Sequence, residues 1–198
     1  ESLIRKYPDS SDVTDAMFRL GGAYEKLEAW DTATTTYTAL IEERKDLEAL
    51  ERVEALARKG SCLIHLGKME DAKPALDEAA AIFLSGRGLP QSASTFYYAM
   101  ARFKMGEIRE SEMRQAMLPA EEPQMEAALE KKCRLLLDAQ SEYTKTIQIG
   151  HPHWAAAAAY RIGDLYRSLW DDLMAAPSPA DLNDEEKDIL RKNEAAVQ

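Results

Sequence analysis

This sequence contains few cysteines, fewer basic than acidic residues and no long apolar run. Its 198 residues include two cysteines, Cys62 and Cys133, which lie far apart and within helical patterns. This placement favours two buried apolar thiols, with a disulfide as the alternative. The cysteines therefore do not decide the compartment.

Apolar runs are too short for a membrane span. The nearest candidate, Trp154 to Ala159, is mostly alanine and falls far below the roughly 20 residues that a spanning helix needs. The sequence thus predicts no membrane insertion by this segment. Because the chain begins at Glu1 and not at methionine, an upstream signal or anchor stays open.

Basic residues are outnumbered, with 25 lysines and arginines against 35 acidic residues and a formal net charge of −10. Nucleic acid phosphates would be repelled unless a basic patch offset this charge, and the sequence contains no such patch. An anionic membrane surface is disfavoured for the same reason. Solubility and basic protein partners are favoured instead. Apolar residues at 45% and charged residues at 30% suit a folded soluble protein.

Motifs that carry chemistry are missing as well. Ser85 to Gly88 has no preceding strand and no lysine–serine pair, so a turn between repeats is favoured over a phosphate loop. His151 and His153 invite a metal site, but no further ligands follow at a recognised spacing, which favours exposed imidazoles at a helix start. We therefore expect no cofactor, no metal and no enzyme activity. An enzyme would have to assemble its site in three dimensions alone.

A repeat is what the sequence does contain, because three segments align at a constant shift of 39 residues. In each copy a small residue stands where two helices are expected to approach closely. It is the second residue of Leu20-Gly21, Lys59-Gly60 and Tyr98-Ala99. The expected turn positions are Glu28, Gly67 and Gly106. After each turn an apolar residue is followed three positions later by a small one: Trp30 and Ala33, Met69 and Ala72, Ile108 and Ser111. Tyr37 and Leu76 continue the second helix, where the third copy has Gln115.

Within the copies, apolar residues recur three and four positions apart, which places them on one stripe of a helix. The first copy shows this in Val13, Met17, Leu20, Tyr24 and Leu27. Strand-like alternation is absent, and the segments are rich in residues with high helix propensity. Each copy is therefore predicted to form a helix, a short turn and a second helix.

This pattern resembles the tetratricopeptide repeat family. The first copy matches the family at Met17, Leu20, Gly21, Tyr24, Ala33 and Tyr37. The second matches at Leu56, Gly60, Leu63, Gly67, Ala72 and Ala79. The third keeps Gly106 and Ser111 but departs at Tyr98, Ala99 and Arg102. The resemblance implies an all-α, right-handed solenoid of antiparallel helix pairs, with repeats longer than the usual 34 or so residues. Residues 11–120 would hold three repeats, and residues 1–10 the end of a preceding one.

The C-terminal part is predicted to form two long helices and a short one. Apolar spacing continues from Met125 until Gly150, and a second helix runs from about Pro152 to Ala176. Within it, Ile162, Gly163 and Tyr166 repeat the Leu-Gly-Tyr spacing, so residues 121–177 are interpreted as a degenerate repeat. Residues 178–198 would form a connector and a capping helix that starts with a capping box. The whole looks like the envelope-associated tetratricopeptide proteins of bacteria, which implies a periplasmic or outer-membrane-associated location, with the cytoplasm as the alternative.

The resemblance also implies a concave groove lined by the first helix of each repeat. Groove positions fall at Phe18, Gly22, Glu25 and Lys26, at Ala57, Ser61, Ile64 and His65, and at Phe96, Met100, Phe103 and Lys104. These residues either bind a partner or pack against the next repeat and the C-terminal helices. No lysine–arginine clamp for a terminal carboxylate is present. We expect a non-catalytic scaffold that holds proteins of a bacterial envelope assembly, with a groove-binding peptide receptor or adaptor as the alternative.

Overall fold

The computed structural model describes residues 11–44, 47–90, 93–119 and 122–176, and every regular element within these ranges is a helix. The first four helices are α2 (Ser11–Lys26), α3 (Trp30–Glu43), α4 (Ala49–His65) and α5 (Met69–Ser85). Three longer helices follow: α6 (Phe96–Gln115), α7 (Glu122–Gln148) and α8 (Pro152–Ala175). The predicted all-α fold and the two long C-terminal helices are confirmed.

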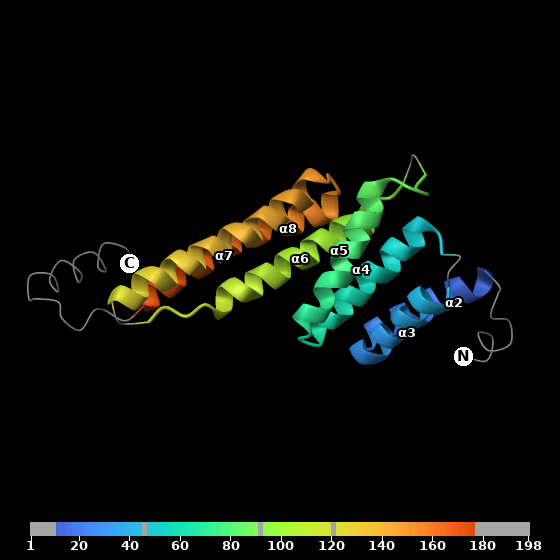
Figure 1. The fold of residues 1–198 in the computed structure, drawn as a ribbon, viewed down its shortest axis with the longest axis horizontal. Helices are drawn as coiled ribbons and strands as arrows, with labels where there is room; N and C mark the ends of the chain where they lie inside the picture. The colour runs from blue at the N-terminus through green and yellow to red at the C-terminus, as the bar shows by residue number, and fades with distance from the viewer. Residues whose placement is uncertain (1–10, 45–46, 91–92, 120–121, 177–198) are drawn as a thin grey trace, which may run out of the picture.

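The helices form a serial stack. Each helix packs against the next one along the chain, and α6 also packs against α4 on one side and α8 on the other. Figure 1 shows the result as an elongated molecule, with α2 and α3 at one end and the long α7 and α8 at the other. A closed bundle would gather its helices around one core. The predicted solenoid of helix pairs is therefore confirmed.

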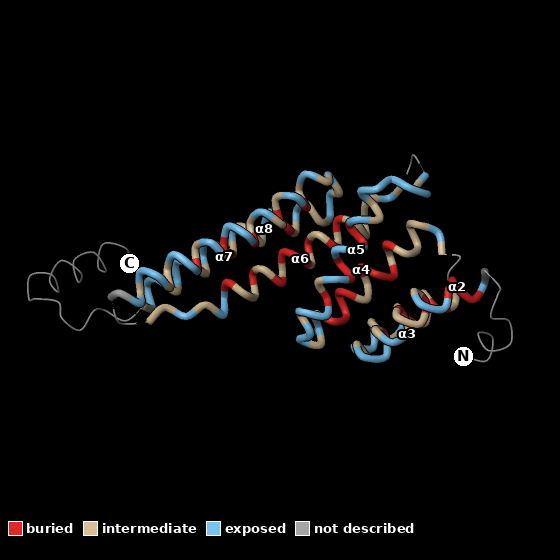
Figure 2. The backbone as a smooth tube through the Cα atoms, in the orientation of Figure 1, coloured by how far each residue is buried: buried red, intermediate tan, exposed pale blue. Residues whose placement is uncertain are grey.

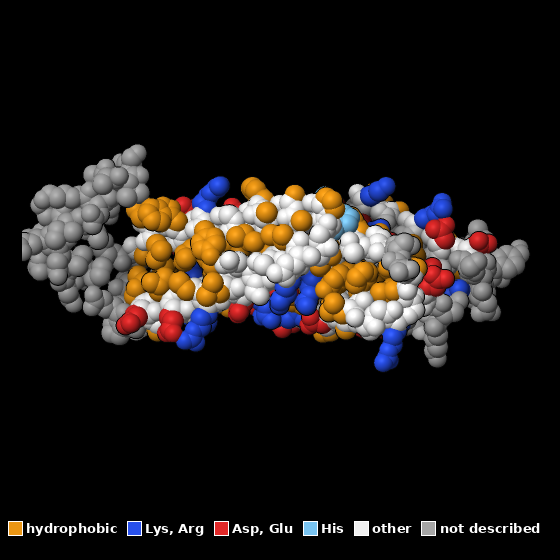
Figure 3. All heavy atoms as spheres, turned by 90° about the horizontal axis from the view of Figure 1, so that it is seen from above, with side chains coloured by type: hydrophobic (Ala, Val, Ile, Leu, Met, Phe, Trp, Pro, Cys, Tyr) orange, Lys and Arg blue, Asp and Glu red, His pale blue; other side chains and the backbone are white. Residues whose placement is uncertain are grey.

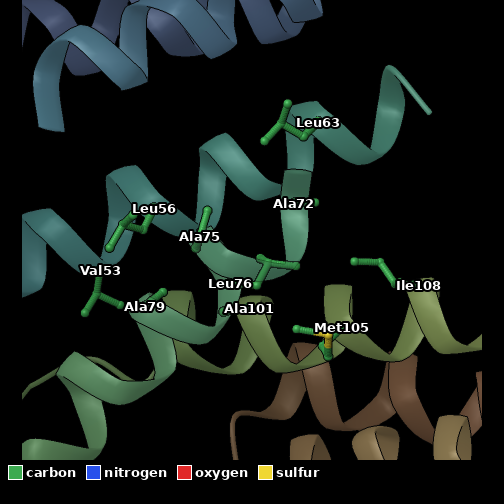
Figure 4. Close-up of a cluster of buried hydrophobic side chains, with 11 residues drawn as sticks. Val53, Leu56, Leu63, Ala72, Ala75, Leu76, Ala79, Ala101, Met105 and Ile108 are labelled. Carbon is green, nitrogen blue, oxygen red and sulfur yellow. The ribbon is translucent and has the colours of Figure 1, made fainter. Parts of the chain in front are cut away.

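Apolar burial follows the same order in three clusters. The first cluster joins α2, α3 and α4 and contains Tyr37, and the last joins α6, α7 and α8 and contains Tyr143. Between them, side chains of α4, α5 and α6 close around Leu76, as Figure 4 shows. Figure 2 places the buried residues along the inside of the stack and leaves much of α7 and α8 exposed. Each helix pair is thus stabilised mainly by its neighbours.

The two turns predicted at Glu28 and Gly67 are confirmed. Both residues have a left-handed backbone, with φ of 55° and 73°. In each turn the amide of the following residue donates to a carbonyl five positions back at 2.9 Å, which satisfies an end-of-helix carbonyl. The turns are therefore equivalent, although one uses glycine and the other glutamate.

The turn predicted at Gly106 is wrong. Helix α6 runs unbroken from Phe96 to Gln115, and Ile108, the expected start of a second helix, is buried within it. Gly106 is retained there for a packing reason, since a ring of α7 occupies the place where its Cβ would lie. Residues 96–115 therefore form one helix in place of a helix, a turn and the start of another.

Two further predictions, the repeat end in residues 1–10 and the connector and capping helix in residues 178–198, lie outside the described residues. Across the part of the chain that the structure describes, no helix combines the length and the apolar character needed to span a bilayer.

Candidate functional site

Three glycines bring the first helix of a pair into close contact with the second. A Cβ at Gly21 would lie 2.6 Å from the ring of Tyr37, and one at Gly60 would lie 2.5 Å from Leu76. A Cβ at Gly106 would lie 2.5 Å from the ring of Tyr143. These distances are shorter than van der Waals contact, so only glycine permits the approach. We call each such contact a glycine seam.

The seams correct the alignment of the third copy. Gly21 and Gly60 are 39 residues apart, but the next seam glycine, Gly106, comes 46 residues later. Four positions before each covering side chain stands a fully buried alanine: Ala33, Ala72 and Ala139. The third pair is therefore α6 with α7. Most of the seven additional residues lie between helices, because ten residues separate α5 from α6 whereas five separate α3 from α4.

Beside the seams, the first helices line two hollows. One, of about 520 Å³, lies between α2 and α4 and is bounded by Phe18, Arg19, Gly22, Ala23, Glu25, Lys26, Glu54 and Arg58. The other, of about 500 Å³, is bounded mainly by α4 and α6: Ile64, His65, Met69, Lys104, Glu107, Glu110, Ser111, Arg114, Gln115 and Arg161. The first hollow joins helices of two repeats, and the second joins α4 and α6 with Arg161 of α8. Each hollow is therefore built from more than one repeat.

Arg58 organises the polar side of the first hollow. Its guanidinium donates to Glu25 at 2.9 Å, to Glu54 at 2.8 Å and to the hydroxyl of Tyr97 at 2.8 Å. Burial raises the pKa of Tyr97 to about 12, so its hydroxyl stays protonated at neutral pH. The charges here are already paired, and they are held by three helices.

Glu110 organises the polar side of the second hollow. Its carboxylate is only 4% exposed and accepts hydrogen bonds from the hydroxyl of Tyr143 at 2.6 Å and from Nε of Arg114 at 2.9 Å. Arg161 lies 3.4 Å from Glu110 and 3.2 Å from Glu107. Burial, followed by the bond to Glu110, raises the pKa of Tyr143 far above its ordinary value. A buried carboxylate needs such partners, and these tie the hollow to the third seam.

The comparison with protein families agrees with this geometry. A family model of the tetratricopeptide repeat matches residues 15–46, which span most of α2 and all of α3, including the first seam. The segment of α2 and α3 is thus similar to one tetratricopeptide repeat. No curated protein and no solved structure matches it. Repeats of this family generally mediate contacts between proteins.

Seven of the predicted groove residues line the hollows: Phe18, Gly22, Glu25, Lys26, Ile64, His65 and Lys104. Their charges are partly engaged, since Lys104 pairs with Glu107 at 2.7 Å and His65 stacks on Trp30 at 4.0 Å. They fall into two groups, one in each hollow.

Five predicted groove residues do not line either hollow. Phe103 is only 6% exposed and packs on Tyr143 and Trp154, so its prediction as a groove residue is wrong. Phe96 packs on Trp154 at the start of α8, and Met100 packs on the middle apolar cluster. The seven-residue misalignment accounts for Phe96 and Met100 but not for Phe103, which takes the position of Phe18 in the corrected alignment. Ala57 and Ser61 are also buried, at 0% and 9% exposure.

Sequence reasoning missed four residues of the second hollow: Glu107, Glu110, Arg114 and Arg161. A signal for the first two was present. Met105-Gly106 followed by Ala139 and Tyr143 repeats the seam pattern of Leu20-Gly21 with Ala33 and Tyr37. Aligning on Gly106 as a seam glycine would have placed Glu107 and Glu110 at the positions of Gly22 and Glu25.

The structure also describes the two histidines and the segment Ser85 to Gly88 that the sequence analysis considered. His151 and His153 lie against Phe96, with ring centroids 5.2 and 6.3 Å apart. No three potential metal ligands converge anywhere in the described ranges. Helix α5 ends at Ser85, and Gly86 takes a left-handed backbone with φ of 65°, so the predicted turn is confirmed.

Proposed function

We propose that this protein is a non-catalytic scaffold that binds other proteins along its first helices, as one component of a multiprotein bacterial envelope assembly. The observation that carries the proposal is the pair of hollows beside the glycine seams. Each is lined by side chains of neighbouring repeats, so a partner that lies across them contacts several repeats at once.

The chemistry of the hollows supports a protein partner. Phe18 contributes apolar surface to the first hollow, and Ile64 and Met69 contribute it to the second. The neighbouring charges are fixed in ion pairs within the chain, such as Arg58 with Glu25. Such a surface offers apolar contact and hydrogen-bond partners without a large excess of one charge. An amphipathic helix or extended segment fits it better than a nucleic acid, which the net charge of −10 would repel.

Cross-linking of the intact chain to proteins of the source cell envelope tests this function. A scaffold should give partner cross-links on α2, α4 and α6 near the hollows, and also on the second helices. Lys26→Glu should lower partner recovery by only about threefold, because the contacts are spread over several repeats. Asp77→Lys, an equally exposed charge reversal on α5, is the matched control. Cross-links confined to regions away from the hollows would contradict the proposal.

The alternative, a receptor for one short peptide, predicts a different result. A single hot spot would then dominate, and Lys26→Glu or His65→Glu alone would lower recovery by about thirtyfold or more.

The envelope location is tested separately by osmotic shock of the source cell. Release of the chain with periplasmic markers, or its retention with the outer membrane, supports the envelope. Recovery with cytoplasmic markers supports the alternative location.

A further inference from the structure

One face of α8 is apolar and exposed along nearly its whole length. The exposed residues of this face are spaced three, four or seven positions apart, so they form a single stripe along the helix: Ala156, Ala159, Tyr160, Gly163, Tyr166, Trp170 and Met174. Tyr160 is 68% exposed and Trp170 is 51% exposed. The stripe is about 27 Å long, from the helical rise per residue. Figure 3, which looks down on α7 and α8, shows hydrophobic side chains gathered over this end of the molecule.

This stripe corresponds to the seam face of the other first helices. Ile162-Gly163 repeats Leu20-Gly21 and Met105-Gly106, and Leu165 and Ala158 on the opposite side of α8 are fully buried. In the three complete pairs, a tyrosine or a leucine of the following helix covers the glycine. At Gly163, by contrast, a Cβ would meet no atom within 4 Å among the described residues.

We propose that the outer face of α8 docks an amphipathic, acidic helix of a partner protein, seated as the second helix is seated in the other three pairs. A leucine of that helix would lie over Gly163. This inference rests on the proposed function, because it names a surface and a class of partner for the same scaffold. The argument for the occupant is continuity, since the chain makes this helix-to-helix contact three times within itself.

The residue four positions after each seam glycine indicates which side chain fits. The two tyrosine covers accompany a carboxylate at this position, and Tyr143 donates its hydroxyl to Glu110 at 2.6 Å. The leucine cover, Leu76, accompanies Ile64 instead. On α8 the position is Arg167, which cannot accept a hydrogen bond from a tyrosine hydroxyl. A leucine therefore fits over Gly163 better than a tyrosine.

Charge gives the second criterion. Arg167 is exposed at the edge of the stripe and has no ion-pair partner within the described part of the chain. A carboxylate on the docked helix would pair with it. The large exposed rings of Tyr160 and Trp170 would supply most of the contact area.

A synthetic peptide of α5, Met69–Ser85, is a suitable probe. In the chain it places Leu76 over Gly60 with Ala72 four positions earlier, and it carries four acidic residues against one lysine. The fluorescent peptide is titrated with the full chain and followed by anisotropy. We expect saturable binding, weakened about tenfold when Leu76→Ala is introduced into the peptide.

Variants of the full chain locate the site. Gly163→Ala should weaken peptide binding about tenfold, because its Cβ would lie where the leucine packs. Arg167→Glu should also weaken it, through like-charge repulsion. Asp77→Ala, at an exposed position of α5 away from the stripe, is the control, and binding should not change. The thermal midpoint of the unbound Gly163→Ala chain should rise, since the face is open and alanine favours the helix.

Several outcomes would overturn the proposal. Absence of peptide binding does so directly. A dimer in solution that Gly163→Ala converts to a monomer would make a second copy the occupant. Tighter peptide binding to a full chain with Ile189→Asp and Leu190→Asp would make residues 177–198 the occupant. If the peptide fails while envelope cross-links still map to the hollows, this inference falls and the scaffold function stands.

Discussion

Helices α2 to α5 are 14 to 17 residues long and pair through short turns, whereas α6 to α8 are 20 to 27 residues long. Both regions nevertheless use the glycine seam: Gly60 lies under Leu76 in the shorter pair and Gly106 under Tyr143 in the longer. The contact that defines a repeat is therefore independent of helix length. A pair can grow by whole turns as long as the seam face is kept.

The two regions also differ at the end of one helix. Glu28 and Gly67 turn the chain with a left-handed residue after α2 and α4. The end of α6 is instead held from a distance, because the ammonium of Lys132 on α7 donates to the carbonyls of Met113 at 3.1 Å and Ala116 at 2.7 Å. The end of α6 thus depends on a tertiary contact, whereas α7 ends as α2 and α4 do, at a left-handed residue, Gly150.

The largest expected effect is on the cover of the third seam. Tyr143→Ala removes a fully buried ring and the donor to Glu110, and should lower the free energy of unfolding by about 3–5 kcal/mol. Urea unfolding followed by circular dichroism measures it. Tyr160→Ala, which truncates an exposed ring on α8, is the control and should change stability by less than about 0.5 kcal/mol. Equal losses at the two sites would mean that the α8 stripe is covered.

The next prediction concerns the seam glycines themselves. Gly106→Ala adds a methyl group 2.5 Å from the ring of Tyr143, and should lower the free energy of unfolding by about 1–3 kcal/mol. Gly163→Ala meets open space and should raise it by up to about 1 kcal/mol, the difference in helix propensity. Denaturation midpoints of the two variants give the comparison. The same sign at both positions would refute the distinction between a closed and an open seam.

An effect of similar or smaller size is expected at the end of α6. Lys132→Met leaves two carbonyls without their donor and breaks the 2.8 Å ion pair with Asp172, so stability should fall by about 1–3 kcal/mol. Lys131→Met, at the exposed neighbouring position, is the control. Amide hydrogen exchange should show faster exchange near Met113 in the first variant alone. Unchanged exchange there would show that α6 closes without help from α7.

The smallest effect concerns the link between the two regions. Burial by itself raises the pKa of Glu112, but hydrogen bonds from Lys73 and Arg109 lower it below its ordinary value. A carboxylate with a lowered folded pKa stabilises the fold above its unfolded pKa, near 4.3, and this contribution is lost as pH falls through the folded value. Because the side chain is still 29% exposed, solvent screens these pairs, and the contribution should stay below about 1 kcal/mol.

Glu112→Gln should therefore lower stability slightly at pH 7 and leave a shallower decline below about pH 4.3 than the parent chain shows. Urea midpoints across this range measure the effect. Glu70→Gln is the control, because Glu70 bonds only Lys73 on its own helix. A Glu112→Gln curve parallel to that of the parent chain would show that the pairing with Lys73 and Arg109 adds nothing to acid stability.

The repeat pattern predicts the first two helix pairs correctly and misaligns the third. Met17, Ala33 and Tyr37 stand at family spacings, and all of them are buried as expected. Gly106 was interpreted as a turn because Gly67 is one at the equivalent position of a 39-residue shift. The error left Glu110 out of the predicted groove, whereas Phe103 takes the position of Phe18 even when Gly106 is aligned as a seam glycine. A constant shift could not detect the extra residues, most of which lie in the connection between α5 and α6.

Local pattern determined the helices, their apolar stripes and the turns at Glu28 and Gly67, because those features depend on residues only a few positions apart. Only the tertiary structure decided that Gly106 lies under Tyr143 while Gly163 faces open space. The reason is physical. A glycine permits both a left-handed turn and a close helix contact, and the choice between them depends on a side chain that is distant in sequence.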